Sequence, residues 1–206
     1  MIERFERDAW EQHWRDALRE RPASAQEANP YLADETAALA PGTALDAGCG
    51  TGADAVRLAE RGWTVTGVDV APSALAAAAA RAARAGTSVS WIEADLTTWA
   101  PEAPFDLVIT CYAHASIPQL DLYRRIGTWV APGGTLLIVG HSTHPAASRH
   151  GHEAPDGSRV TVPEITGLFT GTGWRIRTAR EGSAIVPDHP VRHHDVIVRA
   201  ERPALA

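Results

Sequence analysis

The glycine-rich segment "LDAGCGTGADAV", residues 45–56, is the feature that most constrains the fold of this chain. Gly48, Gly50 and Gly52 alternate between an apolar run and the start of a helical pattern. Glycine adopts backbone conformations that other residues avoid, and its missing Cβ lets another group approach the main chain. The segment predicts a tight connection from a strand into a helix. A structural turn needs about one glycine, so three favour a ligand held against bare backbone.

Predicted strands and helices alternate around this segment. Short apolar runs bounded by glycine and proline indicate strands, and longer amphipathic or alanine-rich runs indicate helices. Pro72 and Gly86 stand just inside the start and just past the end of one helix, as helix boundaries favour. Such strand–helix units imply a parallel, doubly wound sheet with helices on both faces. The predicted strands are residues 44–48, 64–69, 88–95, 105–110 and 135–141, and the helices between them are residues 53–61, 72–85 and 120–130.

The two ends of the chain add helices and a strand pair to this core. Residues 3–20 and 30–39 are predicted helices, and a further helix begins at Pro163. Residues 174–180 and 191–200 are predicted strands whose connecting loop is too short for a crossover helix, so they pair antiparallel. We predict an α/β fold with a doubly wound, Rossmann-like sheet of seven strands, mostly parallel with an antiparallel last strand.

Composition limits the partners and the compartment of the protein. Residues 1–206 are expected to form a single domain with a sizeable core. A formal charge of -6, from 19 Lys plus Arg against 25 Asp plus Glu, argues against nucleic acid as the partner. Two cysteines are too few for a disulfide scaffold, and no apolar run approaches the roughly 20 residues of a membrane span. We expect a cytoplasmic protein without a membrane partner.

Two acidic residues end predicted strands that meet at one edge of the sheet. Asp69 ends the second strand, where a carboxylate accepts the ribose hydroxyls of an adenosine or stabilises the start of the next helix. Asp95 ends the third strand, where it accepts the exocyclic amine of adenine or caps the short helix that follows. From the residues alone, both interpretations of each carboxylate stay open.

The glycine segment satisfies two nucleoside-binding patterns. Gly48, Gly50 and Ala53 match the G-x-G-x-x-G/A pattern of dinucleotide-binding domains, while the three glycines with Asp46 match the D-x-G-x-G-x-G loop of methyltransferases. With "VTGVDVAPSAL", "WIEADLTTW", "FDLVIT" and "WVAPGGTLLIVGH", the chain over residues 43–141 resembles the class I S-adenosylmethionine-dependent methyltransferases. It is most similar to their small-molecule branch, which includes tellurite- and thiopurine-resistance-type enzymes.

The resemblance implies S-adenosylmethionine as the cofactor, S-adenosylhomocysteine as the product, and methyl transfer to a small-molecule acceptor by in-line displacement. It implies that residues 1–40 are a helical lid, residues 43–141 the cofactor-binding core, and residues 142–206 an acceptor-side loop, a helix and the terminal strand pair. The cofactor-binding residues carried over by position are Asp46 at the methionine amino end, Gly48 and Gly50 through their backbone, Asp69 at the ribose, Val70, Asp95 and Leu96 beside the adenine, and Cys111 near the methionine moiety.

The acceptor is expected over the carboxyl ends of the fourth and fifth strands. His114 and His141 are the candidate catalytic bases there, because imidazole titrates near neutral pH; each is alternatively a polar loop histidine. Tyr112 and Tyr31 offer ring faces to a sulfonium or pack in the core. The chain reads T-C-Y-A where enzymes that methylate amino groups of nucleobases or glutamine usually have N-P-P-Y, which disfavours nucleic acid and protein acceptors.

Metal and thiol chemistry are not expected. Histidines are frequent in residues 141–152 and near the end of the chain, but their spacing matches no zinc pattern and thiolate partners are missing. We therefore expect no bound metal. Cys49 lies in the glycine segment without a neighbour that would lower its thiol pKa, so it is not expected to act as a nucleophile.

Two alternatives to a methyltransferase stay open. An NAD(P)-dependent oxidoreductase shares the glycine pattern, but the chain lacks a Tyr-x-x-x-Lys proton relay and contains no lysine. Only 65 residues follow His141, which is little for a substrate domain. A non-catalytic S-adenosylmethionine-binding protein would share both fold and loop, because fold alone does not fix function.

Overall fold

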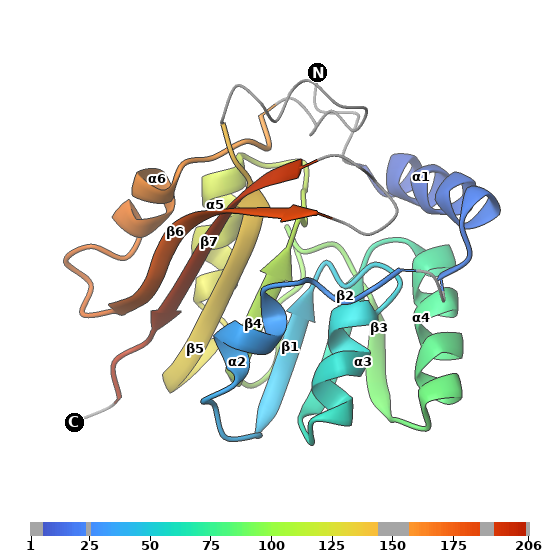
Figure 1. The fold of residues 1–206 in the computed structure, drawn as a ribbon, viewed down its shortest axis with the longest axis horizontal. Helices are drawn as coiled ribbons and strands as arrows, with labels where there is room; N and C mark the ends of the chain where they lie inside the picture. The colour runs from blue at the N-terminus through green and yellow to red at the C-terminus, as the bar shows by residue number, and fades with distance from the viewer. Residues whose placement is uncertain (1–5, 24–25, 144–156, 186–191, 205–206) are drawn as a thin grey trace.

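The computed structural model describes residues 6–23, 26–143, 157–185 and 192–204, and its strands form one seven-stranded sheet (Figure 1). The strand order is β3-β2-β1-β4-β5-β7-β6. β7 runs antiparallel to both β5 and β6, whereas the pairs among β1 to β5 are parallel. The strands are β1 Thr43–Ala47, β2 Thr64–Asp69, β3 Val89–Glu93, β4 Phe105–Cys111, β5 Val130–His141, β6 Arg175–Ile185 and β7 Arg192–Glu201. The predicted Rossmann-like sheet with an antiparallel last strand is confirmed.

Six helices accompany this sheet in the described residues. They are α1 Arg7–Glu20, α2 Leu32–Thr36, α3 Ala53–Glu60, α4 Pro72–Ala85, α5 Gln119–Gly127 and α6 Val162–Gly167. None of the described helices is long and apolar enough to cross a membrane.

Each face of the sheet carries its own hydrophobic core, because neighbouring residues of a strand point to opposite faces. In β4, Val108 belongs to the core that contains Leu122 of α5, whereas Leu107 belongs to the core that contains Leu32 of α2 and Leu58 of α3. Figure 1 shows α2 and α3 in front of the sheet and α5 behind it. Strands covered on both sides explain the nearly continuous apolar runs of the sequence.

The strand β5 starts earlier than the sequence predicted. α5 ends at Gly127, and β5 begins at Val130, so it includes the "APGG" segment, residues 131–134, which lies between the predicted helix 120–130 and the predicted strand 135–141. The backbone there finds partners: Phe105 of β4 pairs with Val130, and Arg202 donates its N–H to the Gly134 carbonyl. Because extended neighbours satisfy these backbone groups, the glycines bend the strand instead of ending it.

The order of the strands reverses between β1 and β4, which pair with each other while β2 extends the sheet to one side and β5 to the other. Connections from adjacent strands diverge at such a point, and ligands of doubly wound folds bind there, outside the carboxyl ends of the strands. The glycine segment leaves β1 at this position. α1 lies across the same edge of the sheet, beside α4 (Figure 1).

Candidate functional site

The glycine segment turns from β1 into α3 through three left-handed residues. Gly48, Gly50 and Gly52 have φ angles of 80°, 50° and 74°. A Cβ on Gly48 would lie 2.4 Å from the Cβ of Ala113, and one on Gly50 would lie 2.7 Å from the Trp14 ring. The turn and its packing alone therefore use all three glycines. The glycine spacing by itself is no longer an argument for a ligand, and that argument has to come from the side chains around the turn.

Asp46, near the end of β1, supplies such an argument. The residue is 2 % exposed, and its Oδ2 has no hydrogen-bond partner among the described residues. Burial raises the pKa of Asp46 well above its usual range, and the nearby charges of Asp54 and Asp69 add to the rise. A buried carboxylate oxygen without a donor is costly, so this position is complementary to a positively charged donor.

Two further carboxylates lie at this edge. The Gly50 N–H donates to Oδ2 of Asp69 over 2.8 Å, and the Ala71 N–H donates to its Oδ1 over 2.9 Å. In the first turn of α3, Asp54 accepts the Asn29 N–H over 2.6 Å. Burial raises the pKa of both carboxyls, and these backbone donors oppose the rise. Asp69 thus fixes both the glycine segment and the start of α4. We refer to the three residues Asp46, Asp54 and Asp69 as the carboxylate cluster.

Asp54 was not singled out from the sequence. An aspartate in the first turn of a helix is common, because it interacts favourably with the helix dipole, so its residue type carried no specific signal. Only the approach of α3 to the end of β1 brings it beside Asp46.

The other predicted cofactor residues differ from the carboxylate cluster in their burial and contacts. Val70 is half-buried and Leu96 is buried, whereas Asp95 is exposed. Oδ1 of Asp95 accepts the Thr97 N–H over 2.7 Å, so Asp95 caps a turn at residues 96–98, where the sequence predicts a short helix. The backbone at Cys111 ends β4 next to the carboxylate cluster, whose charges act on its thiol.

Neither cysteine is poised as a nucleophile. Burial raises the pKa of the Cys49 thiol well above its usual range, and the Cys111 thiol is affected in the same way. Both thiols therefore stay protonated at neutral pH, whereas thiol nucleophiles react as thiolates.

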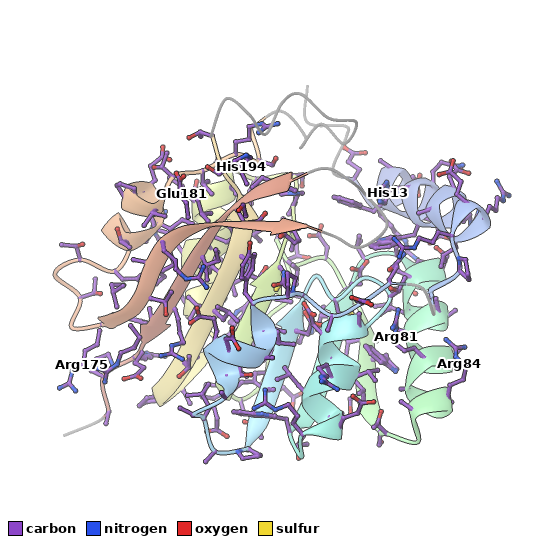
Figure 2. All side chains as sticks on the ribbon, in the orientation of Figure 1. His13, Arg81, Arg84, Arg175, Glu181 and His194 are labelled. Carbon is purple, nitrogen blue, oxygen red and sulfur yellow. The ribbon has the colours of Figure 1, made fainter. Side chains whose placement is uncertain are left out.

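Helix α1 covers the carboxylate cluster from the side of α4. Trp14 packs on Gly50, Glu11 accepts the Ser73 N–H over 3.0 Å at the start of α4, and Arg7 forms an ion pair with Glu93. His13, labelled in Figure 2, lowers the pKa of Asp69 through its charge, although burial outweighs this effect. These contacts hold α1 over the ends of β1 to β3.

The segment after α1 is tied to the glycine segment by Arg81 of α4 (Figure 2). Its guanidinium donates to the carbonyl oxygens of Thr51 and Gln26, each over 3.0 Å, and to that of Ala23. The Thr51 hydroxyl donates to the Gln26 side chain over 2.5 Å. This role could not be predicted, because Arg81 stands in an alanine-rich run that has the composition of a surface helix.

At the ends of β4 and β5 lies a series of stacked rings, which we call the ring column: Trp10, His114, His141 and Tyr112. The His114 ring centroid lies 6.3 Å from that of Trp10, with 21° between the planes. His114 and His141 are 5.4 Å apart at 24°, and His141 and Tyr112 are 4.8 Å apart at 31°. The two histidines predicted as bases are thus in contact. Burial lowers the pKa of His114, so its neutral form is favoured.

A buried carboxylate, Asp195 of β7, lies behind the ring column. Asp195 pairs with His141 in the register of the sheet, and the Tyr31 hydroxyl donates to its Oδ2 over 2.8 Å. Tyr112 also hydrogen bonds to Asp195, and burial raises the pKa of its phenol well above the usual range. The Arg180 guanidinium lies 5.3 Å from the Tyr31 ring centroid. Asp195 was missed in the sequence because it stands in a polar run beside two histidines.

Tyr112 has a backbone conformation that points to a constrained site. Its φ of 56° is the only positive value at a non-glycine residue in the part of the chain that the structure describes. Such a conformation costs free energy and persists where the surroundings demand it, often at functional sites. The Tyr112 N–H is held by the Val139 carbonyl over 2.9 Å.

Among the described residues, no three or more His, Cys, Asp or Glu side chains are arranged to hold a metal ion. The histidine-rich residues 144–156 and His189 lie outside the described ranges. The expected absence of a metal stays a prediction.

Comparison with known proteins finds similarity to methyltransferases. Residues 44–134 match the family described as "Methyltransferase domain". An uncharacterised methyltransferase of Mycobacterium bovis is 38% identical over 113 residues, which are 52% of this chain and 55% of that protein. The chain spans about half the length of the curated relatives it matches.

Solved structures share the fold over most of the chain. One, from work on the conversion of a disulfide bond into a thioacetal group during echinomycin biosynthesis, has a TM-score of 0.68 and 28% identity, and the match covers 87% of this chain and 83% of that one. The N-methyltransferase NodS of Bradyrhizobium japonicum, in complex with S-adenosylhomocysteine, has a TM-score of 0.64 and 21% identity, with 90% and 87% of the two chains covered.

Proposed function

We propose that the protein transfers the methyl group of S-adenosylmethionine to a small-molecule acceptor. The proposal is made for a chain with a class I, Rossmann-like methyltransferase domain. The observation that carries the proposal is the buried Asp46 carboxylate, whose Oδ2 has no donor among the described residues. It stands at the end of β1, within the part of the chain that matches the methyltransferase family.

The net charge of the ligand distinguishes S-adenosylmethionine from NAD as the cofactor of this site. S-adenosylmethionine carries an ammonium and a sulfonium group against one carboxylate, so it is a net cation. NAD carries a pyrophosphate with two negative charges, which the carboxylate cluster would repel. Because the cluster already raises the pKa of Asp46, a cation is the ligand that relieves its charge. The acidic cluster therefore favours the methyl donor over a dinucleotide.

The residues of this chain have the following proposed parts. Asp46 binds the ammonium group, and the backbone of Gly48 and Gly50 contacts the methionine end of the cofactor. Asp69 accepts the ribose hydroxyls with the lone pairs that its two backbone donors leave available. Val70, Asp95 and Leu96 border the adenine, and the Cys111 backbone lies near the methionine moiety.

The lid is proposed to be α1, held over the site by Trp14 and Glu11. When bound, the cofactor supplies a methyl carbon attached to a positively charged sulfur. The sulfur is a good leaving group because it becomes a neutral thioether when the methyl group is transferred. The protein then has to align the acceptor with that carbon, exclude water and remove a proton where the acceptor carries one.

The acceptor is proposed to lie at the ring column, with His114 and His141 as the candidate bases. The formal charge of -6 and the T-C-Y-A sequence after β4 support a small molecule over nucleic acid. Both cysteines are free thiols, which supports the proposal that the protein is located in the reducing environment of the cytoplasm.

Titration calorimetry of the full chain with S-adenosylhomocysteine and with NAD tests the cofactor. We expect heat of binding with the first ligand and none with the second. Binding of NAD alone would overturn the proposal in favour of an oxidoreductase.

Transfer is tested with S-adenosylmethionine labelled in its methyl group and a panel of thiols, selenols, phenols and amines. Label in at least one acceptor is expected. Tight binding of the cofactor with no labelled acceptor would instead identify a non-catalytic binding protein.

A further inference from the structure

We propose that Gln119 is a positioning residue that holds His114 in the tautomer protonated at Nδ1, so that the Nε2 lone pair acts as base toward the methyl acceptor. This inference rests on the proposed function and deepens it. It assigns a residue that neither the sequence nor the family match singled out. It also assigns the acceptor class: a molecule whose accepting atom still carries a proton near neutral pH, such as an alcohol, a phenol or a protonated amine.

Both ends of the Gln119 amide are engaged. Gln119 is the first residue of α5 and is buried. Its Nε2 donates to the Ala113 carbonyl over 2.9 Å, and its Oε1 lies 2.8 Å from Nδ1 of His114. A backbone carbonyl only accepts hydrogen bonds, so the amide nitrogen has to face Ala113 and the amide oxygen has to face His114.

This orientation determines the imidazole tautomer. The amide oxygen also only accepts, so Nδ1 of His114 has to carry the hydrogen. In a neutral imidazole the other ring nitrogen then holds the lone pair. The carbonyl of Ala113, through one amide side chain, therefore decides which nitrogen of His114 is basic.

The surroundings keep His114 neutral and restrict its rotation. Burial is the main influence on the pKa of His114 and lowers it, while the hydrogen bond with Gln119 raises it. The ring stacks against Trp10 of α1 and His141 of β5, which limits rotation about its Cβ–Cγ bond.

Within the part of the chain that the structure describes, the titratable groups around His114 come from three elements. They are His141 on β5, Tyr123 on α5, which interacts with the same Gln119 side chain, and His13 on α1, whose ring lies 5.4 Å from that of Trp10. Because burial lowers the pKa of His114, the base is a neutral imidazole.

The chemistry of the step sets the acceptor class. The bond between the accepting atom and its hydrogen breaks, and the proton moves to Nε2 of His114. The electron pair left on the accepting atom forms the bond to the methyl carbon, while the pair of the carbon–sulfur bond stays on sulfur. The imidazolium then returns its proton to water. An acceptor already ionised at neutral pH would need no base, so the arrangement is useful only for one that is protonated.

The tautomer is tested first, on the protein without added ligands. Nitrogen NMR of ¹⁵N-histidine-labelled protein is expected to show His114 with a protonated Nδ1 and a bare Nε2. In Gln119→Leu, which has no acceptor, this preference is expected to disappear. Gln119→Glu keeps an acceptor, so the tautomer should persist and the pKa of His114 should rise by about one unit or more. Arg124→Ala, on the exposed face of the same helix, is the matched control and should change neither property.

Kinetics with an acceptor from the labelling panel test the use of the base. We expect Gln119→Leu to lower kcat about tenfold without changing the S-adenosylhomocysteine affinity, and Gln119→Glu to restore most of kcat with the acid limb of its pH profile shifted upward. A wild-type His114 protonated at Nε2, or a pH profile that ignores both variants, would overturn the inference. If the wild-type protein does not bind S-adenosylhomocysteine, the proposed function is wrong, whereas the tautomer of His114 measured by NMR is unaffected.

Discussion

The ends of β1 and β2 and the ends of β4 and β5 form two halves of one sheet edge, and they are built from opposite kinds of groups. The first half contains the carboxylate cluster, in which burial raises the pKa of each carboxyl and the charges of Asp54 and Asp69 add to the rise at Asp46. The second half contains the ring column, in which burial keeps His114 neutral.

This difference fits the two tasks of the proposed methyl transfer. The acidic half is suited to hold a cation, because a cation relieves the charges that burial makes costly. The neutral half is suited to remove a proton, because only an unprotonated imidazole accepts one. Helix α1 contacts both halves, through Trp14 on Gly50 and Trp10 on His114. Under the proposed function, the protein separates binding of the methyl donor from proton removal at the acceptor.

The largest expected effect lies in the ring column. We predict that His114→Asn lowers kcat about a hundredfold, because a positioned general base contributes on this scale. The affinity for S-adenosylhomocysteine, measured by calorimetry, is expected to stay within about twofold. If the affinity for S-adenosylhomocysteine falls as much as kcat, the two halves of the edge do not have separate functions.

A smaller effect is expected in the carboxylate cluster. Asp46→Asn removes the charge that would bind the ammonium group, so the dissociation constant for S-adenosylhomocysteine is expected to rise about tenfold or more. At saturating cofactor, kcat should remain close to that of the wild type. Asp34→Asn, at an exposed position of α2, is the control and should leave affinity unchanged. A variant that lowers kcat but not affinity would place Asp46 in the chemistry instead of in binding.

The two tryptophans of α1 give a sharper form of the comparison, with effects of about three- to tenfold. Trp14→Ala removes the ring that packs on Gly50, so we predict weaker cofactor binding. Trp10→Ala removes the ring that stacks on His114, so we predict a lower kcat. Steady-state kinetics and calorimetry on both variants separate these effects. Equal changes in both parameters for both variants would mean that α1 acts only as a cover.

The smallest expected effect is in the pH dependence of stability, about 1.4 kcal/mol per unit of pKa shift. The raised pKa of Asp46 means that the folded state holds its proton more tightly than the unfolded one. Stability should therefore fall as pH rises from the ordinary value of 3.8 through the raised pKa. The lowered pKa of His114 acts in the opposite direction, because the unfolded state binds the proton more tightly than the folded state. The contribution of His114 to the stability of the fold is therefore lost as pH falls below 6.5.

Urea denaturation of the ligand-free protein between pH 5 and pH 8 measures both slopes. Asp46→Asn is expected to reduce the fall in stability with rising pH, to which the raised pKa values of Asp54 and Asp69 also contribute, and His114→Asn to remove the loss at low pH. Bound S-adenosylhomocysteine should also reduce the fall at high pH. A wild-type stability that rises steadily over the whole range would contradict the acidic half of the comparison.

Most of the fold could be predicted from local sequence patterns. The apolar runs gave the strands, and Pro72 with Gly86 gave the ends of α4, because these residues act on the backbone around them. The start of β5 was predicted wrongly, since the "APGG" segment has the composition of a turn. Its extended form depends on pairing with β4 and with the backbone beyond β7, which local composition does not contain.

The site could be predicted only in part. Asp46 was singled out by its position relative to the glycines and Asp69 because it ends the second predicted strand. Asp54, Asp195 and Gln119 were missed, because an aspartate or a glutamine at a helix start or in a polar run is common and gains meaning only from distant neighbours. The glycines themselves were given too much weight, since the structure shows that packing against Ala113 and Trp14 already requires them.

The sequence by itself determined the type of sheet, the position of the turn after β1 and the two histidines after β4 and β5. These features depend on residues close together in the chain, where spacing converts directly into geometry. The tertiary structure alone decided that three carboxylates share one buried edge and that α1 covers both halves. It also decided that the Gln119 amide lies between the Ala113 carbonyl and Nδ1 of His114, which is the basis of the proposed tautomer. Burial and contact between distant segments create these properties, because they change the free energy of a charge or a proton without changing any residue.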